Sequence, residues 1–125
     1  MTTKNVGDAG EAQALAHLLG QGLTLVERNY RVARGPNALG GEVDLILREP
    51  DGTLVFVEVR TRRSASHGGA AASVGTIKQR RLVLAAQYFL QRFKTLPACR
   101  FDVVTIEGQG VPARIEWLRA AFDTS

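Results

Sequence analysis

Two strand-like stretches around a tight turn constrain this chain more than any other feature of its sequence. Residues 42–49 and 53–61 are rich in Val, Leu, Ile and Phe, and Pro50-Asp51-Gly52 separates them. Proline is pre-set for the first turn position, and glycine accepts the left-handed backbone that closes a three-residue loop. The sequence therefore predicts an antiparallel hairpin that begins with Glu49 opposite Thr53.

This register gives the hairpin two faces of different character, because side chains alternate between the faces of a strand. One face is continuously apolar and is formed by Val43, Leu45, Leu47, Val55, Val57 and Val59. The other face changes from apolar to charged along three cross-strand pairs: Ile46 with Phe56, Asp44 with Glu58, and Glu42 with Arg60.

A different turn would change this arrangement. A two-residue Asp51-Gly52 turn would shift the register and place Asp44 and Glu58 on opposite faces. It would also put Pro50 inside a strand, where proline cannot donate a hydrogen bond to the ladder. We therefore prefer the three-residue loop.

In the preferred register, Asp44 and Glu58 form an acidic pair. Directly opposed residues have Cβ atoms about 4.5–5.5 Å apart, and like charges at that separation repel each other. The pair therefore needs a proton or a cation, and oxygen ligands at this spacing suit Mg²⁺ or Mn²⁺. The alternative interpretation is an ordinary sheet whose solvent face carries charges.

The rest of the chain adds two helices and three strands to the hairpin. Apolar spacing predicts a helix over 8–19, and a longer helix runs from Thr76 to about Phe93 with Gln79 in a capping-box position. Further strands are predicted at 23–30, 100–106 and 114–118. The order α-β-β-β-α-β-β predicts an α/β fold, and 125 residues fit a single domain over 1–125.

Composition argues against several classes of protein. Cys99 is the sole cysteine, so the chain has no internal disulfide and no CxxC zinc cluster. The sequence contains no apolar run of membrane-spanning length, and its start lacks the apolar segment of a signal peptide. We expect a cytoplasmic protein without a membrane partner.

Basic residues gather downstream of the acidic pair. The formal net charge is +4, and residues 59–101 contain nine Lys or Arg but no Asp or Glu. A stretch of one sign suggests a polyanionic partner such as nucleic acid, although a solvated helix face could have the same composition. The candidates for phosphate contact are Arg62, Arg63, Lys78, Arg80 and Arg81.

Five stretches, taken together, resemble one protein family. They are Gly7-x-x-Gly10-Glu11-x-x-Ala14, Gly41-Glu42-Val43-Asp44-Leu45-Ile46, Val55-Phe56-Val57-Glu58-Val59-Arg60, Lys78 with Arg81, and Arg100-Phe101-Asp102-Val103-Val104. In this order they look like the YraN-like family of uncharacterised bacterial proteins. That family is similar to archaeal Holliday-junction resolvases and to the PD-(D/E)XK nuclease superfamily. The resemblance covers about residues 5–122 and implies a restriction-endonuclease-like (tRNA-endonuclease-like) fold, a mixed central sheet flanked by helices.

The resemblance also implies roles for single residues. Asp44 matches the metal-binding aspartate, and Glu58 matches the second acidic ligand. Glu11 matches a metal-site glutamate of resolvase-like members, although it could instead form a capping box with Asp8. Arg60 stands where the E-x-K element has lysine. Because arginine keeps its proton in proteins, Arg60 could stabilise a phosphate but could not activate water.

The sequence supports two main functional hypotheses. The first is a nuclease that hydrolyses phosphodiester bonds with Mg²⁺ or Mn²⁺ held by Asp44 and Glu58. Arg60 would stabilise the transition state, and Glu42 is interpreted as an outer ligand or, preferably, as the ion-pair partner of Arg60. The second is a catalytically degenerate nuclease fold that binds DNA or RNA without cutting, as an arginine in the lysine position would favour. A small structural domain is disfavoured by the ordered acidic face.

The expected partner is nucleic acid, with DNA favoured over RNA. Cleavage of a branched junction would also need a homodimer with two-fold symmetry.

Overall fold

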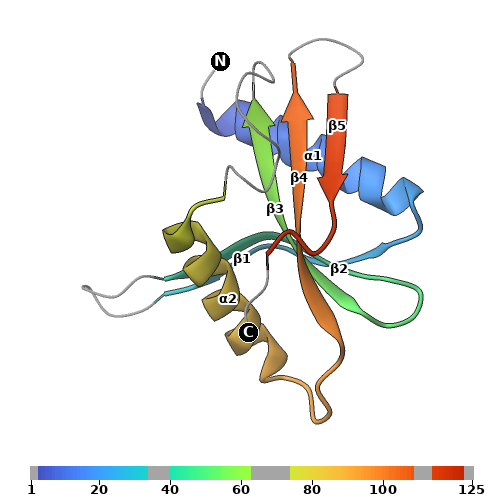
Figure 1. Cartoon of the computed structure of the whole chain (residues 1–125), viewed down its shortest axis with the longest axis vertical. Helices are drawn as coiled ribbons and strands as arrows, with labels where there is room; N and C mark the ends of the chain where they lie inside the picture. The colour runs from blue at the N-terminus through green and yellow to red at the C-terminus, as the bar shows by residue number, and fades with distance from the viewer. Residues whose placement is uncertain (1–2, 34–39, 63–73, 109–113, 123–125) are drawn as a thin grey trace.

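The chain forms a five-stranded sheet with one helix on each face (Figure 1). A computed structural model describes residues 3–33, 40–62, 74–108 and 114–122. Its elements are α1 (Thr3–Gly20), β1 (Thr24–Val32), β2 (Gly41–Arg48), β3 (Leu54–Arg62), α2 (Thr76–Leu90), β4 (Cys99–Glu107) and β5 (Arg114–Leu118). The predicted α/β class and the predicted order of helices and strands are confirmed.

The strands lie side by side in chain order, β1-β2-β3-β4-β5. All neighbours are antiparallel except β3 and β4, which are parallel. Two parallel strands cannot be joined by a tight turn, because the chain must return to the starting edge. The segment between them contains α2, which thereby packs across the sheet beside β1 and β2.

The hairpin of β2 and β3 has the predicted register. Ile46 lies opposite Phe56, and the Glu49 amide donates to the Thr53 carbonyl at 2.9 Å. Gly52 has the expected left-handed φ of 96°. The three-residue loop is therefore confirmed, and the two-residue alternative is wrong.

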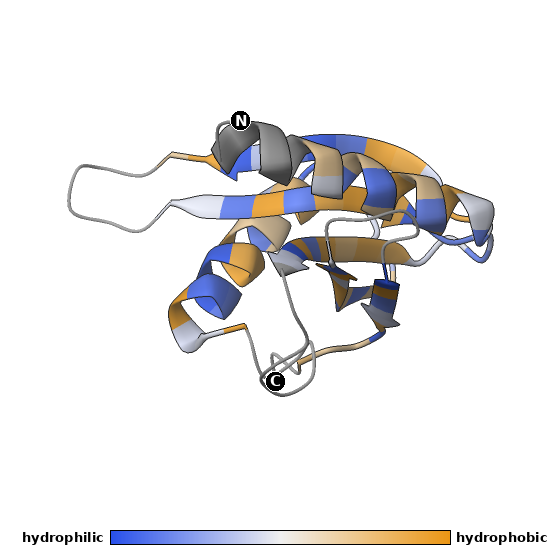
Figure 2. Cartoon of the chain, turned by 90° about the horizontal axis from the view of Figure 1, so that it is seen from above, coloured by the Kyte–Doolittle hydropathy of each residue, from blue (hydrophilic) through white to orange (hydrophobic). Residues whose placement is uncertain are grey.

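Each helix covers a separate core. On one face, Ala14 and Leu18 of α1 pack against the β2 and β3 side chains Leu45, Leu47, Val55 and Val57. On the other face, α2 packs against Ile46, Phe56, Phe101 and Val103 through Leu82, Ala85, Ala86 and Phe89. Figure 2 shows the two helices on opposite sides of the sheet. Full burial contributes about 1.5–3 kcal/mol for each large apolar side chain.

The alternation of side chains along β2 changes at Asp44. Leu45 faces α1, whereas Val43 packs with Ile46 in the core beside α2, so the prediction that Val43 shares a face with Leu45 is wrong. The neighbouring strand has an unusual backbone conformation at the same level. Asn29 of β1, between the partners of Leu45 and Val43, has a left-handed φ of 52°. Asparagine tolerates this conformation better than most residues, and both strands turn here together.

The helix ends differ from the prediction. α1 begins at Thr3 rather than at residue 8, so Asp8 lies inside the helix and the proposed capping box with Glu11 is wrong. α2 ends at Leu90 rather than near 93, and Gly75 is its N-cap without a side-chain hydrogen bond. Gln79 does not close a capping box, because its side-chain amide donates a hydrogen bond to the Val74 carbonyl at 3.0 Å. No described helix is long and apolar enough to cross a membrane.

Candidate active site

The acidic pair lies where β2 and β3 separate. The described pairing of these strands ends at Leu45 and Val57, one step before Asp44 and Glu58. Beyond that point the Asp44 carboxylate accepts a hydrogen bond from the Val59 amide at 2.8 Å. The Asp44 side chain thus takes the place of a main-chain carbonyl and points towards β3.

Glu58 is a buried carboxylate with a lysine partner. Its side chain is 3% exposed, and its Oε2 atom lies 2.8 Å from Nζ of Lys78, whose side chain is 42% exposed. A buried ionised carboxylate is costly unless it is paired. Lys78, which the sequence assigned to a phosphate-binding surface, therefore belongs to the acidic pair in this structure.

The charges of Asp44 and Lys78 both affect the protonation of Glu58. Burial and, as a smaller cause, the nearby negative charge of Asp44 together raise the pKa of Glu58 from 4.5 to about 7, against the opposing effect of Lys78. The structure therefore brings together the two carboxylates that the hairpin register predicted. Because the pKa of Glu58 is close to 7, this carboxyl group exchanges readily between a protonated and an ionised form at neutral pH.

The donor set fits a hard divalent cation. Oε2 of Glu58 makes the ion pair with Lys78 but has no well-oriented hydrogen bond within the described part of the chain. This carboxylate is thus only partly satisfied, and Asp44 supplies a second oxygen ligand beside it. Magnesium commonly binds through one or two carboxylates and completes its shell with water and phosphate oxygens.

Within the described part of the chain, this group contains no third protein ligand. Across residues 3–33, 40–62, 74–108 and 114–122, no three His, Cys, Asp or Glu side chains form a cluster that could hold a metal ion. Glu11 follows Gly10, where an added Cβ would lie 2.4 Å from the Thr61 hydroxyl near the end of β3. The helix is thus close to β3, but Glu11 as a third ligand stays a prediction.

The predicted ion pair between Glu42 and Arg60 is wrong. Glu42 instead pairs with Arg81 of α2 at 3.0 Å, and Arg81 also donates to the Gly40 carbonyl at 3.2 Å. The cause is the close approach of α2 to Gly41, where an added Cβ would lie 2.7 Å from the backbone nitrogen of Ala85. This contact places an arginine beside Glu42 in the region where β2 and β3 have already separated.

Arg60 lies on β3 next to a residue that sequence reasoning missed. Its partner in the parallel ladder is Thr105 of β4, which is 1% exposed. The Thr105 hydroxyl has no hydrogen-bond partner within the described residues. A threonine in a strand is ordinary in sequence, so no local pattern could have marked this position.

An open hollow of about 470 Å³ lies at the N-terminal end of α2, and two of its lining residues are basic. Its lining consists of Gly75, Thr76, Ile77, Lys78 and Arg81. The first turn of α2 contains no acidic residue, and the amides of a helix N-terminus attract anions. Lys78 and Arg81 are one turn apart and line the same hollow. Arg80 is exposed, whereas the Arg62 side chain and Arg63 lie outside the described residues.

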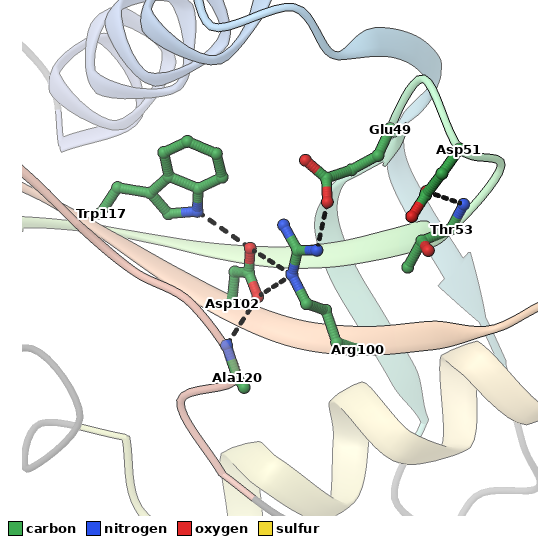
Figure 3. A network of polar contacts seen from close by, with 7 residues as sticks. All are labelled: Glu49, Asp51, Thr53, Arg100, Asp102, Trp117 and Ala120. Carbon is green, nitrogen blue, oxygen red and sulfur yellow. Dashed lines mark hydrogen bonds and ion pairs between the residues drawn. The ribbon is translucent and has the colours of Figure 1, made fainter.

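A second polar network lies on the opposite face of the sheet (Figure 3). Asp102 is fully buried and accepts hydrogen bonds from the Trp117 indole, the Ala120 amide and Arg100 at 2.9, 2.9 and 3.0 Å. Arg100 also pairs with Glu49 of the hairpin end. This network ties the end of β5 to β4 and belongs to the fold rather than to the acidic pair.

Comparison with known proteins places the chain in a family. The model described as "Uncharacterised protein family UPF0102" matches residues 10–106. The chain belongs to this family. The chain is 65% identical over 125 residues to a UPF0102 protein of Methylibium petroleiphilum, covering 100% of this chain and 99% of the relative. It is 58% identical over 124 residues to a UPF0102 protein of Acidovorax sp., covering 99% and 89%. The family resemblance seen in the sequence is thereby confirmed.

Proposed function

We propose that this chain is a metal-dependent nuclease of restriction-endonuclease-like fold that hydrolyses phosphodiester bonds of nucleic acid, with DNA the favoured substrate. The observation that supports this proposal best is the group of Asp44, the buried Glu58 and Lys78, beside the hollow at the N-terminal end of α2. A structural ion pair would need one carboxylate, whereas the described residues of this site are two carboxylates and one lysine. The surplus negative charge favours a further cation.

Asp44 and Glu58 would hold Mg²⁺ or Mn²⁺ at the separation of β2 and β3. When bound, such an ion polarises a phosphate and lowers the pKa of a water molecule. The hydrogen bond from Val59 to Asp44 fixes the orientation of that carboxylate and leaves its other oxygen for the ion. Burial of Glu58 limits competition from water.

Basic side chains on two elements would hold the phosphate. Arg81 is anchored by Glu42 and the Gly40 carbonyl, so its position beside the hollow is defined. Arg60, on the strand that carries Glu58, has a guanidinium group that can stabilise negative charge on the phosphate.

A cleavage screen tests the proposal directly. Purified chain is incubated with Mn²⁺ or Mg²⁺ and with linear, single-stranded and branched DNA, with RNA as a comparison substrate. We expect cutting that requires the ion and is lost in Asp44→Asn and in Glu58→Gln. Glu27→Gln, which removes a carboxylate from the edge strand β1, is the matched control and should retain cutting. Cutting that survives Asp44→Asn and Glu58→Gln together would refute the assigned site.

A nucleic-acid-binding protein without nuclease activity is the second candidate, and Arg60 in the usual lysine position is the observation that favours it. In that case the chain binds DNA with a strong salt dependence, but no metal-dependent cutting accompanies binding. Arg60→Lys separates the two candidates. A gain of cutting in this variant, where the natural chain has none, would identify Arg60 as the cause of the loss.

A further inference from the structure

Lys78 has two environments within reach. Its ammonium group contacts the buried Glu58 carboxylate at 2.8 Å, yet 42% of its side chain is exposed. The same residue lines the hollow at the N-terminal end of α2 together with Arg81. Lysine carries its charge on a flexible four-carbon chain. Rotation about these bonds can therefore move the ammonium from the carboxylate to the hollow while the helix stays in place.

The Lys78 ammonium would balance a different negative charge beside Glu58 than in the hollow. Beside Glu58 the ammonium balances a buried carboxylate that also experiences the charge of Asp44. A divalent ion bound by the same two carboxylates would repel an ammonium at contact distance. The lysine and the ion therefore compete for one position. Arg81 does not compete in this way, because Glu42 and Gly40 hold its guanidinium elsewhere.

We propose that Lys78 is the resident cation of the acidic pair, that a divalent ion displaces it into the hollow of α2, and that the displaced ammonium then contacts a phosphate of the nucleic acid. This inference rests on the proposed function for the identity of the ion and of the substrate. It assigns Lys78 a role as a phosphate-binding residue that is available only after the ion has bound. Metal binding thereby prepares the substrate site, and the two events are coupled through one side chain.

The first test measures the affinity of the full chain for Mn²⁺ by calorimetry in the absence of nucleic acid. Lys78→Gln removes the competing charge, and we expect it to bind Mn²⁺ about tenfold more tightly than the natural chain, since a like charge at contact distance is lost. Arg80→Gln removes an equal charge from the same helix without touching Glu58 and should change the affinity by about twofold or less. Thermal unfolding of each variant checks that it is folded.

The outcomes separate the inference from the proposed function. Mn²⁺ binding in the natural chain with equal or weaker binding in Lys78→Gln would overturn the inference and leave the metal site intact. Absence of Mn²⁺ binding in both chains would overturn the proposed function and the inference together.

The second test measures the salt dependence of binding to a short duplex DNA, in EDTA and in Ca²⁺. With Ca²⁺, the natural chain should have a log–log slope steeper by about 0.9 than that of Lys78→Gln, which corresponds to one phosphate contact. In EDTA the two slopes should agree, because Lys78 remains with Glu58. Equal slopes in Ca²⁺, or a difference already present in EDTA, would refute the displacement of Lys78 to a phosphate.

Discussion

Glu58 makes the stability of this fold depend on pH in a way that can be measured without a substrate. Burial and the neighbouring Asp44 raise the pKa of Glu58 from 4.5 to about 7 in the folded chain. The folded state therefore binds more protons than the unfolded state between these two pH values. By linkage, the free energy of unfolding must fall as pH rises from about 4.5 to 7 and must level off above that range.

The size of the effect follows from the same two values. A rise of the pKa from 4.5 to about 7 corresponds to about 3 kcal/mol of stability that is present at acidic pH and lost at alkaline pH. Glu58→Gln keeps the shape of the side chain and removes its titration. Its stability relative to the natural chain should therefore increase by about 3 kcal/mol between pH 4 and pH 8.

Urea denaturation of the two chains at pH 4, 6 and 8 measures this difference. Glu27→Gln corrects for the loss of one negative charge from the sheet. Asp44→Asn should reduce the pH dependence without abolishing it, because burial is the larger cause of the raised pKa of Glu58. Parallel pH profiles for the natural chain and Glu58→Gln would show that this carboxyl group is not buried beside Asp44, and the site as described would be wrong.

Three further substitutions test other parts of the structure by urea denaturation. Asp102→Asn should lower the free energy of unfolding by about 3 kcal/mol, because it disrupts a buried, charge-assisted network; a loss below about 1 kcal/mol would contradict that network. Thr105→Val should raise it by about 1 kcal/mol, because it removes a buried hydroxyl that lacks a described partner, whereas a loss would reveal a hydrogen bond. Gly41→Ala should lower it by about 1–3 kcal/mol through its clash with Ala85, while Gly20→Ala, which meets nothing within 4 Å, should be tolerated.

The hairpin and its acidic pair could be predicted because they depend on neighbouring residues. Pro50 and Gly52 determine the loop, the loop determines the register, and the register brings Asp44 towards Glu58. Each step involves local turn chemistry or the two-residue period of a strand. The carboxylate pair was therefore accessible from the sequence before any tertiary contact was known.

The cations around the pair could not be predicted, because they come from another element. Lys78 and Arg81 reach Glu58 and Glu42 only because α2 crosses the sheet and approaches Gly41 closely. No spacing along the chain encodes that approach. Sequence reasoning instead paired Glu42 with the residue opposite it in the hairpin register, which would have required β2 and β3 to stay together.

The position of Val43 and Leu45 on different faces of the sheet could not be predicted from the sequence for a similar reason. Strict alternation grouped Val43 with Leu45, but Val43 packs in the other core, at the level where Asn29 of the neighbouring strand has a left-handed backbone. The helix ends were imprecise because α1 extends five residues beyond the start of its recognised apolar spacing, to Thr3.

The parallel pairing of β3 with β4 places the acidic pair and its lysine in parts of the fold that differ in the sequence range of their contacts. Asp44 and Glu58 belong to one hairpin, which forms from contacts close in sequence, whereas Lys78 arrives with the crossover that α2 makes between the parallel strands. Parallel pairing forms slowly, because the connecting segment must be ordered before its contacts stabilise it. If the hairpin forms before α2 packs, the two carboxylates approach each other without their lysine. Protons or dissolved cations would then supply the balancing charge, so we expect the folding rate to depend on the ionic composition of the medium.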